Sequence, residues 1–461
     1  MNSHSAAATH KSIPGPSVWQ TPFCLSAFRN DPIGFLQDLH QRYGDTVRIP
    51  LGLPLLSVRH PDSVRYVLQE HHKNYDKGQD YERLEVVLGK GLLTANGAEW
   101  RRHRKLAQPA FHKQRLPGFA SIMLRRTAQR MDDWHRHGST MQLDIHAELM
   151  ALTLEIVGES LFSSDLSSQT EEVGLSLGEL LRLTNEYINA LVPTPLWFPT
   201  PFTIKFRREL AVLDRVVKKL IEARMSPEGD TGSDLLGMLL SAHLHTEGSE
   251  REQPLSVEEI RDEVMTLLLA GHETTANALS FAFMLLTQHR DIADKLYAET
   301  ISVLGNRAPT FEDLPQLRYA KQVAEEAMRL YPPVWAIGRR AIAQDVIDGH
   351  TIAPGTHILM SQFLVQRDAR FFADPLRFDP ERFAPDLASK RHHGAYFPFA
   401  AGPRQCIGMG FAIMELQLVL SALIQKVEIT VLAPERIELE PLITLRPKHG
   451  MRAQVRFRQL S

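Results

Sequence analysis

Cys406 is the residue whose surroundings most strongly suggest chemistry. It lies in the segment Phe399-Ala-Ala-Gly402-Pro-Arg404-Gln-Cys406-Ile-Gly408, and the chain contains only one other cysteine. A structural zinc site needs more cysteine or histidine ligands than this loop offers. A thiolate that binds a flat metal cofactor needs close backbone approach, an apolar shield and donors directed at the sulfur. Gly402 and Gly408 permit tight turns, Phe399 can shield the sulfur, and Arg404 can reach an anionic group. The alternative is an ordinary packed thiol.

A second group of reactive side chains lies in the segment Ala270–Thr274, with the sequence AGHET, inside a predicted helix. A zinc-protease helix would need a second histidine four residues after His272, where this chain has Ala276. Two interpretations stay open. Glycine and threonine can be tolerated interruptions of a helix. Alternatively, the Thr274 hydroxyl competes for a backbone carbonyl and opens a polar notch beside the proton-carrying carboxyl of Glu273.

Two further pairs of residues are spaced for one face of a helix. Trp100 and Arg104 are four residues apart and can reach the same carboxylate, although a run of basic residues is most often a solvated face. Glu326 and Arg329 are three residues apart and can form an ion pair. At a surface such a pair is worth only about 0–1 kcal/mol. Neither pair indicates a function by itself.

A long helix must position the AGHET segment. Ser256 with Glu259 three residues later forms a capping box, and apolar residues at helical spacing continue to about Gln288. The pattern predicts a helix of roughly 30 residues, ~45 Å long at 1.5 Å per residue. Helices dominate elsewhere, and the chain is predicted to be mainly α with a smaller β region. The other predicted segments are a loose N-terminal arm at 1–30, a hairpin within 47–58, a long ordered loop at 77–96, an apolar loop at 191–202 and a strand at 451–457.

The composition is that of an ordinary globular chain. Hydrophobic residues make up 43% of its 461 residues, and 52 basic against 54 acidic residues give a formal net charge of −2. This balance gives no support for a nucleic-acid partner, and two cysteines argue against a disulfide scaffold. The N-terminus lacks the apolar core of a signal peptide, and the most apolar stretch, Val264–Leu286, carries His272 and Glu273 in its middle. We therefore expect a cytoplasmic monomer with no membrane anchor.

Together these motifs resemble those of the cytochrome P450 family, the haem-thiolate monooxygenases. The Phe-x-x-Gly-x-Arg-x-Cys-x-Gly segment is similar to the haem-binding loop of that family. The AGHETT segment, the Glu-x-x-Arg pair followed by Pro380-Glu-Arg382-Phe, and Trp100-x-x-x-Arg104 occur in the family's order. The resemblance covers the chain from about Pro14 onward. It implies a soluble, bacterial-type member with a triangular helical domain, in which the haem is buried between the long central helix and the cysteine loop. Residues 31–461 would form a single cytochrome P450 catalytic domain.

The resemblance also implies a role for each motif. Cys406 would bind the iron of haem b, which is iron protoporphyrin IX. Thr274 would be the oxygen-activating threonine and Glu273 its acidic neighbour, and together they would deliver protons. Arg382 would complete a structural triad with the Glu-x-x-Arg pair. The implied cofactor-binding residues are Trp100, Arg104, Ala270, Gly271, Arg339 (with Arg340 as the alternative), Phe399, Arg404, Cys406 and Gly408.

The activity that follows from the resemblance is insertion of one oxygen atom of dioxygen into a hydrophobic small molecule. Electrons would come from a separate ferredoxin or flavodoxin and its reductase. We expect a group of basic residues to project outward from the Trp100 helix, or just after it, as a docking face for this partner. This group comprises Arg101, Arg102, Lys105, Lys113 and Arg115.

The substrate is expected to be a terpenoid or other lipid-like compound, because the candidate pocket segments are largely apolar. These segments are Tyr81–Leu93, Leu191–Phe202, Leu268, Val334–Ala336 and Leu442–Ile443. Within them, Arg83 and Lys90 are the cations that could anchor a carboxylate. Alternatives are a fatty-acid hydroxylase, a peroxide-driven member or, in another class, a non-catalytic haem sensor or electron carrier. A carrier does not need the notch at Gly271–Thr274.

Overall fold

The structure is a computed structural model that describes residues 12–167, 170–190, 192–226, 234–244 and 255–459. The chain divides into two compact units. The first, called the sheet unit here, comprises Met1–Asp80, Trp335–Pro375 and Arg391–Gln405. The second, the helical unit, comprises Tyr81–Val334, Leu376–Lys390 and Cys406–Ser461. The fold class is mainly α with small β sheets, as the sequence predicts.

The sheet unit is built on a five-stranded sheet of order β1-β2-β8-β5-β3. The predicted hairpin forms its first two strands, which pair antiparallel. Strand β8 then runs parallel to β2, and β5 and β3 continue antiparallel. The strands are β1 (Thr46–Pro50), β2 (Pro54–Val58), β8 (His357–Met360), β5 (Ile337–Ala341) and β3 (Tyr75–Asp76). A separate hairpin joins β6 (Asp345–Ile347) to β7 (His350–Ile352).

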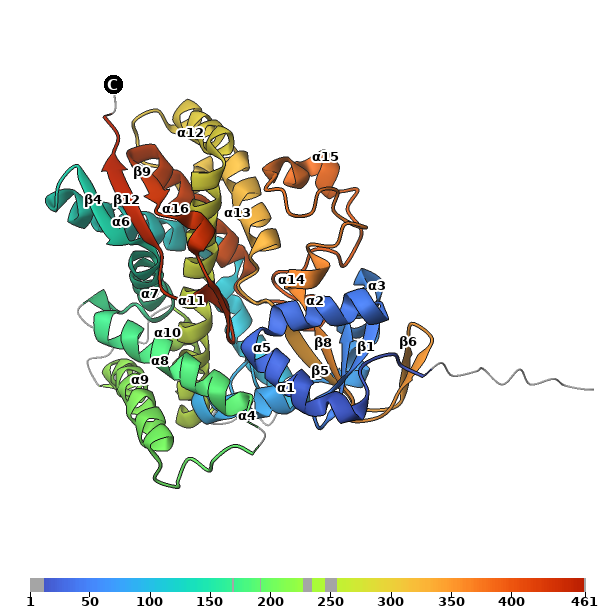
Figure 1. The fold of residues 1–461 in the computed structure, drawn as a ribbon. Coiled ribbons are helices and arrows are strands. Elements are labelled where there is room, and N and C mark those ends of the chain that lie inside the picture. Colours follow the sequence, from blue (N-terminus) through green and yellow to red (C-terminus); the bar gives the residue numbers. More distant parts are fainter. Residues whose placement is uncertain (1–11, 168–169, 191, 227–233, 245–254, 460–461) are drawn as a thin grey trace, which may run out of the picture. The chain divides into compact units, whose positions relative to one another are not determined.

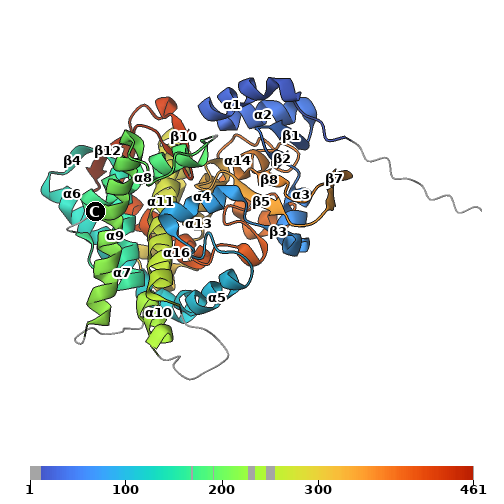
Figure 2. The same ribbon diagram turned by 90° about the horizontal axis from the view of Figure 1, so that it is seen from below.

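Two helices precede this sheet, α1 (Thr21–Asn30) and α2 (Pro32–Tyr43), and Figure 2 shows them beside strands β1 and β2. The expected loose arm is therefore wrong over residues 21–30, whereas residues 1–11 lie outside the described residues. Pro22 sits in the first turn of α1, where a missing N–H costs nothing, and Asp31 caps α2 by accepting from the Gly34 N–H at 2.9 Å. Cys24 is buried on α1, so the second cysteine is a packed thiol.

The centre of the helical unit is α11 (Val257–Gln288), which confirms the predicted long helix (Figure 1). Its capping box is present: Ser256 Oγ accepts from the Glu259 N–H, and the Glu259 carboxylate accepts from the Ser256 N–H. Helices α7 (Ile145–Phe162), α13 (Arg318–Leu330) and α16 (Met409–Lys426) pack against it. Among the described residues, α16 has the length and apolar composition of a membrane span, and 72% of it is buried inside the protein, as in a core helix.

Further helices and small sheets complete this unit. The predicted C-terminal strand is confirmed as β12 (Arg452–Phe457), which lies between β4 (Thr140–Asp144) and β9 (Val427–Val431). Strands β10 (Leu439–Pro441) and β11 (Leu445–Pro447) form a hairpin. The remaining long helices are α5 (Gly97–Ala107), α6 (Leu116–Arg136), α8 (Thr170–Ile188), α9 (Pro201–Met225), α10 (Leu235–Leu244) and α12 (Arg290–Leu304).

Two predicted loops differ from the structure. The segment 77–96 contains helix α4 (Gln79–Leu88), which buries Leu84, Val87 and Leu88 at helical spacing between flanking glycines. The apolar loop at 191–202 ends earlier than expected, because α9 begins at Pro201 (residue 191 lies outside the described residues). A proline in the first turn starts a helix rather than breaking it, and Thr200 caps this one.

Candidate active site

The predicted site residues fall in both units. Arg339, Phe399 and Arg404 belong to the sheet unit. The others belong to the helical unit, namely Trp100, Arg104, Ala270, Gly271, Glu273, Thr274, Cys406 and Gly408.

Cys406 lies in the loop that directly precedes α16, whose N-cap is Gly408. Its side chain is exposed, yet the surrounding protein desolvates the thiol and raises its pKa. A hydrogen bond from the Gly408 N–H and the positive charge of Arg104 on α5 act in the opposite direction and favour the thiolate. An anionic metal ligand needs such donors, so the surroundings of Cys406 fit the requirements of a thiolate ligand.

The two glycines of the cysteine loop, Gly402 and Gly408, differ in whether the backbone conformation and the neighbouring atoms require a glycine. Gly402 has a φ of 71°, and a Cβ at this position would collide with the carbonyl oxygen of Leu68, so glycine is required there. Gly408 has an ordinary φ of −89° as the cap of α16, and a Cβ would meet Phe111 only at 3.6 Å. Both glycines lie in turns, but only the conformation and packing of Gly402 require a glycine. Phe399, the predicted shield, is half-buried in the sheet unit.

A cluster of cations forms in the sheet unit around Lys77, which sequence reasoning missed. Lys77 is 6% exposed, and its pKa lies well below the usual range because of burial and the positive charges of Arg339 and Arg404, which Asp80 partly offsets. Strand β3 pairs antiparallel with β5, and this pairing carries Lys77 to Arg339. Two guanidinium groups and a buried lysine in one place offer donors that suit the two carboxylates of a haem, and these carboxylates would favour a protonated Lys77.

Arg340, the alternative to Arg339 as a cofactor-binding residue, is bound to another side chain. Its guanidinium binds the Asp76 carboxylate, with two contacts of 3.2 Å. Arg339 is 5% exposed and takes part in the electrostatics of the Lys77 cluster. The contacts therefore favour Arg339 over Arg340 as a cofactor-binding cation.

Helix α5 carries Trp100 and Arg104 on one side, one turn apart, and both are half-buried.

The group of basic residues predicted to project outward from this helix, or just after it, does so only in part. Arg101, Lys105 and Lys113 are exposed, and Arg115 is half-buried. Arg102 instead turns inward and forms an ion pair with Glu259 of α11. The expectation for Arg102 was wrong because the acidic first turn of α11 attracts it.

Within the AGHET segment, Thr274 Oγ1 donates to the Ala270 carbonyl oxygen at 2.8 Å. The predicted competition for a backbone carbonyl is present, but α11 stays α-helical throughout, so the predicted local opening is not seen. A Cβ at Gly271 would lie 2.9 Å from Cγ2 of Val157 on α7. The close packing of α11 against α7 therefore leaves no room for a larger residue at this position.

Glu273 is buried on α11 at 3% exposure, and burial raises the pKa of its carboxyl. The Thr444 hydroxyl donates to it, and the charge of Arg446 lowers the pKa while Glu440 raises it. Thr444 lies in the β10–β11 hairpin, and no local pattern in the sequence points to it. The arrangement gives a buried acid that can hold a proton one residue from the Thr274 hydroxyl.

The Glu-x-x-Arg pair forms a fully buried ion pair. Arg329 Nε and Nη2 donate to the two carboxylate oxygens of Glu326 at 2.6 and 2.7 Å, and both side chains are wholly buried. The Asp379 N–H donates to the same carboxylate at 2.9 Å, and Arg382 approaches it at 3.5 Å. The predicted contacts of the triad are therefore present.

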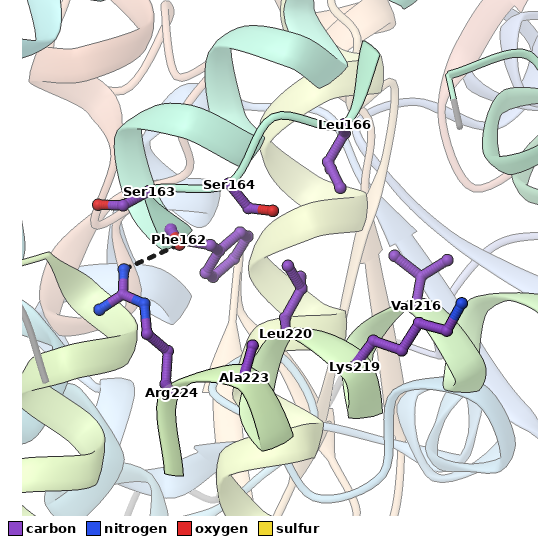
Figure 3. Close-up of a pocket in the computed structure, with 9 residues that line it drawn as sticks. All are labelled: Phe162, Ser163, Ser164, Leu166, Val216, Lys219, Leu220, Ala223 and Arg224. Carbon is purple, nitrogen blue, oxygen red and sulfur yellow. Dashed lines mark hydrogen bonds between the residues drawn. The ribbon is translucent and has the colours of Figure 1, made fainter. Parts of the chain in front are cut away.

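A pocket of about 200 Å³ opens elsewhere in the helical unit, between the end of α7 and α9. Figure 3 shows Phe162, Leu166 and Leu220 along its apolar side and the Arg224 guanidinium donating to the Phe162 carbonyl oxygen at 3.0 Å. None of the predicted site residues lines this pocket, so we assign it no part in the chemistry.

Comparison with known proteins decides the family. A family model described as Cytochrome P450 matches residues 13–452. The chain belongs to the cytochrome P450 family. It is therefore a cytochrome P450 monooxygenase, an oxidoreductase that binds haem b through a cysteine thiolate. The Cys406 thiol with its donors and the cation cluster at Lys77 have the chemistry that this cofactor requires.

Several curated relatives of this P450 match over most of their length. Cyclooctatin synthase from Streptomyces melanosporofaciens is 34% identical over 90% of this chain and 89% of its own. Putative cytochrome P450 132 from Mycobacterium tuberculosis is 33% identical over 97% of this chain and 98% of its own. Cyclooctat-9-en-7-ol 5-monooxygenase from S. melanosporofaciens is 34% identical over 85% of this chain and 84% of its own.

Proposed function

We propose that this P450 oxygenates a terpenoid-like hydrocarbon, with Cys406 as the iron ligand and Glu273 and Thr274 as the proton-delivering pair. The observation that carries the catalytic assignment is the buried carboxyl of Glu273 beside Thr274, in the same unit as Cys406. Burial raises the pKa of this carboxyl, which favours its protonated form and suits a group that passes a proton to the adjacent hydroxyl.

When bound, haem supplies the iron at which dioxygen is reductively activated, so that one oxygen atom enters the substrate and the other leaves as water. Cys406 would hold that iron through its sulfur, with the Gly408 N–H and Arg104 stabilising the thiolate. Lys77, Arg339 and Arg404 in the sheet unit, and Trp100 and Arg104 in the helical unit, would bind its carboxylates.

The ligand assignment is tested by exchanging the cysteines. Cys406→His should abolish the red-shifted Soret band of the reduced carbonyl complex or prevent haem binding, because a thiolate is lost. Cys24→Ala is the matched control, since Cys24 is a buried thiol on α1. Loss of the band in Cys24→Ala with retention in Cys406→His would overturn the assignment.

The role of Thr274 is tested by removing its hydroxyl. Thr274→Ala should retain haem and the substrate-induced spin shift but should release peroxide in place of product, because the hydroxyl that would relay protons from Glu273 is missing. Thr274→Ser keeps a hydroxyl and should restore coupling between reductant and product. Equal uncoupling in both variants would contradict a role for the hydroxyl.

The substrate proposal rests on the relatives and on Arg83. Two relatives are named for cyclooctatin and cyclooctat-9-en-7-ol, and they are terpenoid-modifying P450s. Arg83, one of two cations in the candidate pocket segments, already donates to the carbonyl oxygens of Ile188 and Ala190 at the end of α8. Lys90 is exposed. A guanidinium bound to a helix terminus is a poor anchor for a fatty-acid carboxylate.

A spin-shift titration separates the substrate classes. Terpenoid alcohols and hydrocarbons should convert the haem from low to high spin, whereas fatty acids of similar size should do so weakly. A strong shift with fatty acids that disappears in Arg83→Gln would favour the fatty-acid hydroxylase instead.

We further propose that α5 and the segment after it receive an acidic electron donor, a ferredoxin or flavodoxin. Arg101, Lys105 and Lys113 are exposed there, next to the helix that carries Arg104. Charge reversal at Arg101 and Lys105 should slow reduction by the donor and flatten its salt dependence, because steering weakens as the Debye length shrinks. Charge reversal at Lys218, exposed on α9, is the control. Equal rates in both variants would contradict this docking face.

A further inference from the structure

Two facing helices in the helical unit each present a pair of side chains that can bind metal ions. Glu99 and His103 lie one turn apart on α5, and Glu259 and Glu263 lie one turn apart on α11. Residues four apart share a face of a helix. The ligand atoms of Glu99, His103 and Glu259 all lie within 4.8 Å of one another.

His103 is held in one orientation from behind. Its Nδ1 lies 2.5 Å from Glu263 Oε1, and both side chains are wholly buried. Burial alone would lower the pKa of His103, but the hydrogen bond to Glu263 and the nearby negative charges raise it. The contact fixes the ring so that Nε2 lies toward Glu259, 3.5 Å away, and a proton on Nδ1 would donate to Glu263 and leave the Nε2 lone pair for a metal ion. A carboxylate behind a histidine is the usual support of a histidine metal ligand.

Glu263 has a second carboxylate oxygen that this contact does not use. Its Oε2 atom has no hydrogen bond of normal geometry to any residue that the structure describes, although the Leu92 N–H lies near enough to lower the pKa of the carboxyl that burial raises. A cation bound to Nε2 of His103 would polarise the imidazole and strengthen the bond to Glu263. The buried carboxylate is thus an observation independent of the three grouped ligand atoms.

We propose that Glu99, His103 and Glu259 bind one divalent transition-metal ion of the zinc class, with Glu263 as the positioning residue behind His103. One imidazole nitrogen and two carboxylate oxygens suit zinc, which takes three protein ligands and a water in open sites. Magnesium and calcium prefer sets made only of oxygen atoms. The ion would connect α5, which carries Trp100 and Arg104, to the first turn of α11.

A competing cation already contacts this site. Arg102 forms an ion pair with Glu259, whose carboxylate also accepts from the Ser256 N–H at 2.7 Å. The metal ion must displace Arg102 from the carboxylate in order to bind. This competition limits the affinity and makes Arg102 a diagnostic position, because its removal should tighten zinc binding.

The experiment uses the full-length, haem-loaded protein after chelator treatment, titrated with zinc chloride in a calorimeter. Glu99→Gln should weaken binding at least about tenfold, since even supporting residues of a metal ligand are worth about 10–100-fold in affinity. Glu258→Gln, an exposed neighbour on α11, should leave it unchanged. Arg102→Gln should tighten it. These variants concern half-exposed or exposed residues and avoid the buried His103–Glu263 pair.

Thermal unfolding supplies a second measurement that does not depend on activity. Zinc should raise the melting temperature of the parent protein and not of Glu99→Gln, and magnesium should have no such effect. Equal stabilisation by magnesium would mean screening of acidic groups and would overturn the proposal. So would zinc binding that is unchanged in both Glu99→Gln and Arg102→Gln, or no saturable binding at millimolar zinc.

Discussion

Two regions of the helical unit bury carboxylates in opposite ways. At α13, Glu326 receives two donors from Arg329, the Asp379 N–H and the nearby charge of Arg382. At α11 and α16, Glu273 has the Thr444 hydroxyl, and Glu415 has no hydrogen bond of normal geometry to any residue that the structure describes. All three side chains are buried, at no more than 3% exposure.

The two regions differ in how far the partners of each buried carboxyl stabilise its ionised form. Burial raises the pKa of each carboxyl, but Arg329 opposes this rise at Glu326. At Glu415 the pKa is raised well above the usual range, and only the Thr275 hydroxyl opposes the shift. A buried charge with a full set of partners holds elements together, whereas a buried acid with few partners remains able to take up a proton.

The largest expected effect is on the rate of product formation, at Glu273, the proposed proton-delivering acid. Glu273→Gln should lower the rate of product formation by about 10²–10⁴-fold, the usual contribution of a proton-transferring group, while haem content stays unchanged. Single-turnover product formation measures this loss, and Glu273→Asp, which keeps an acid, should recover part of it. A loss below about threefold would point to a different proton route.

The largest effect on stability is expected at the structural pair. Arg329→Ala leaves Glu326 buried without its bidentate partner and should cost about 3–5 kcal/mol of the free energy of unfolding. Denaturant unfolding of the haem-loaded protein measures this change. A loss below about 1 kcal/mol, the range of an exposed ion pair, would remove the distinction between the two regions.

Replacing the Glu415 carboxyl should increase the free energy of unfolding, whereas Arg329→Ala decreases it, and the size of the increase should depend on pH. Its folded-state pKa is raised above the ordinary value of 4.5, so its stabilising effect is complete below that value and is lost as pH rises through the folded pKa. Glu415→Gln lacks this loss and should be more stable than the parent by about 1–3 kcal/mol above the folded pKa, the cost of an unsatisfied buried group. The two proteins should converge in acid.

Unfolding curves at several pH values test this difference, and Glu326→Gln is the control. Because Arg329 would lose its charged partner, Glu326→Gln should be less stable than the parent protein on both sides of the Glu415 transition. A constant difference between the Glu415→Gln variant and the parent at every pH would contradict an ionising carboxyl at this position.

The smallest change in the free energy of unfolding is expected at Arg382, the outermost member of the Glu326–Arg329–Arg382 group. Arg382 lies 3.5 Å from Glu326 and its side chain is 15% exposed, while Arg329 still neutralises the carboxylate. Arg382→Ala should therefore cost about 1 kcal/mol, close to the value of an ordinary ion pair. A cost equal to that of Arg329→Ala would show that the three residues act as one unit.

Much of the fold and of the site follows from spacings within about four residues. The capping box at Ser256 and Glu259, the length of α11 and the shared helix face of Trp100 and Arg104 were predicted in this way. Helix α4 was missed although its buried residues are spaced helically, because the glycines on either side indicated a loop. The N-terminal arm was wrong over α1 for a related reason, since prolines that start helices resemble prolines that end them.

By itself the sequence determined the family through the order of its motifs, and it predicts Cys406 as the iron ligand, since these inferences depend on residue types at short fixed separations. Tertiary structure alone decided which distant groups meet. It brought Lys77 to Arg339 through the pairing of β3 with β5, Thr444 to Glu273, and Arg102 to Glu259. The physical reason is that burial and long-range partners, which set the charge state of an acid or base, come from chain segments that no local pattern connects.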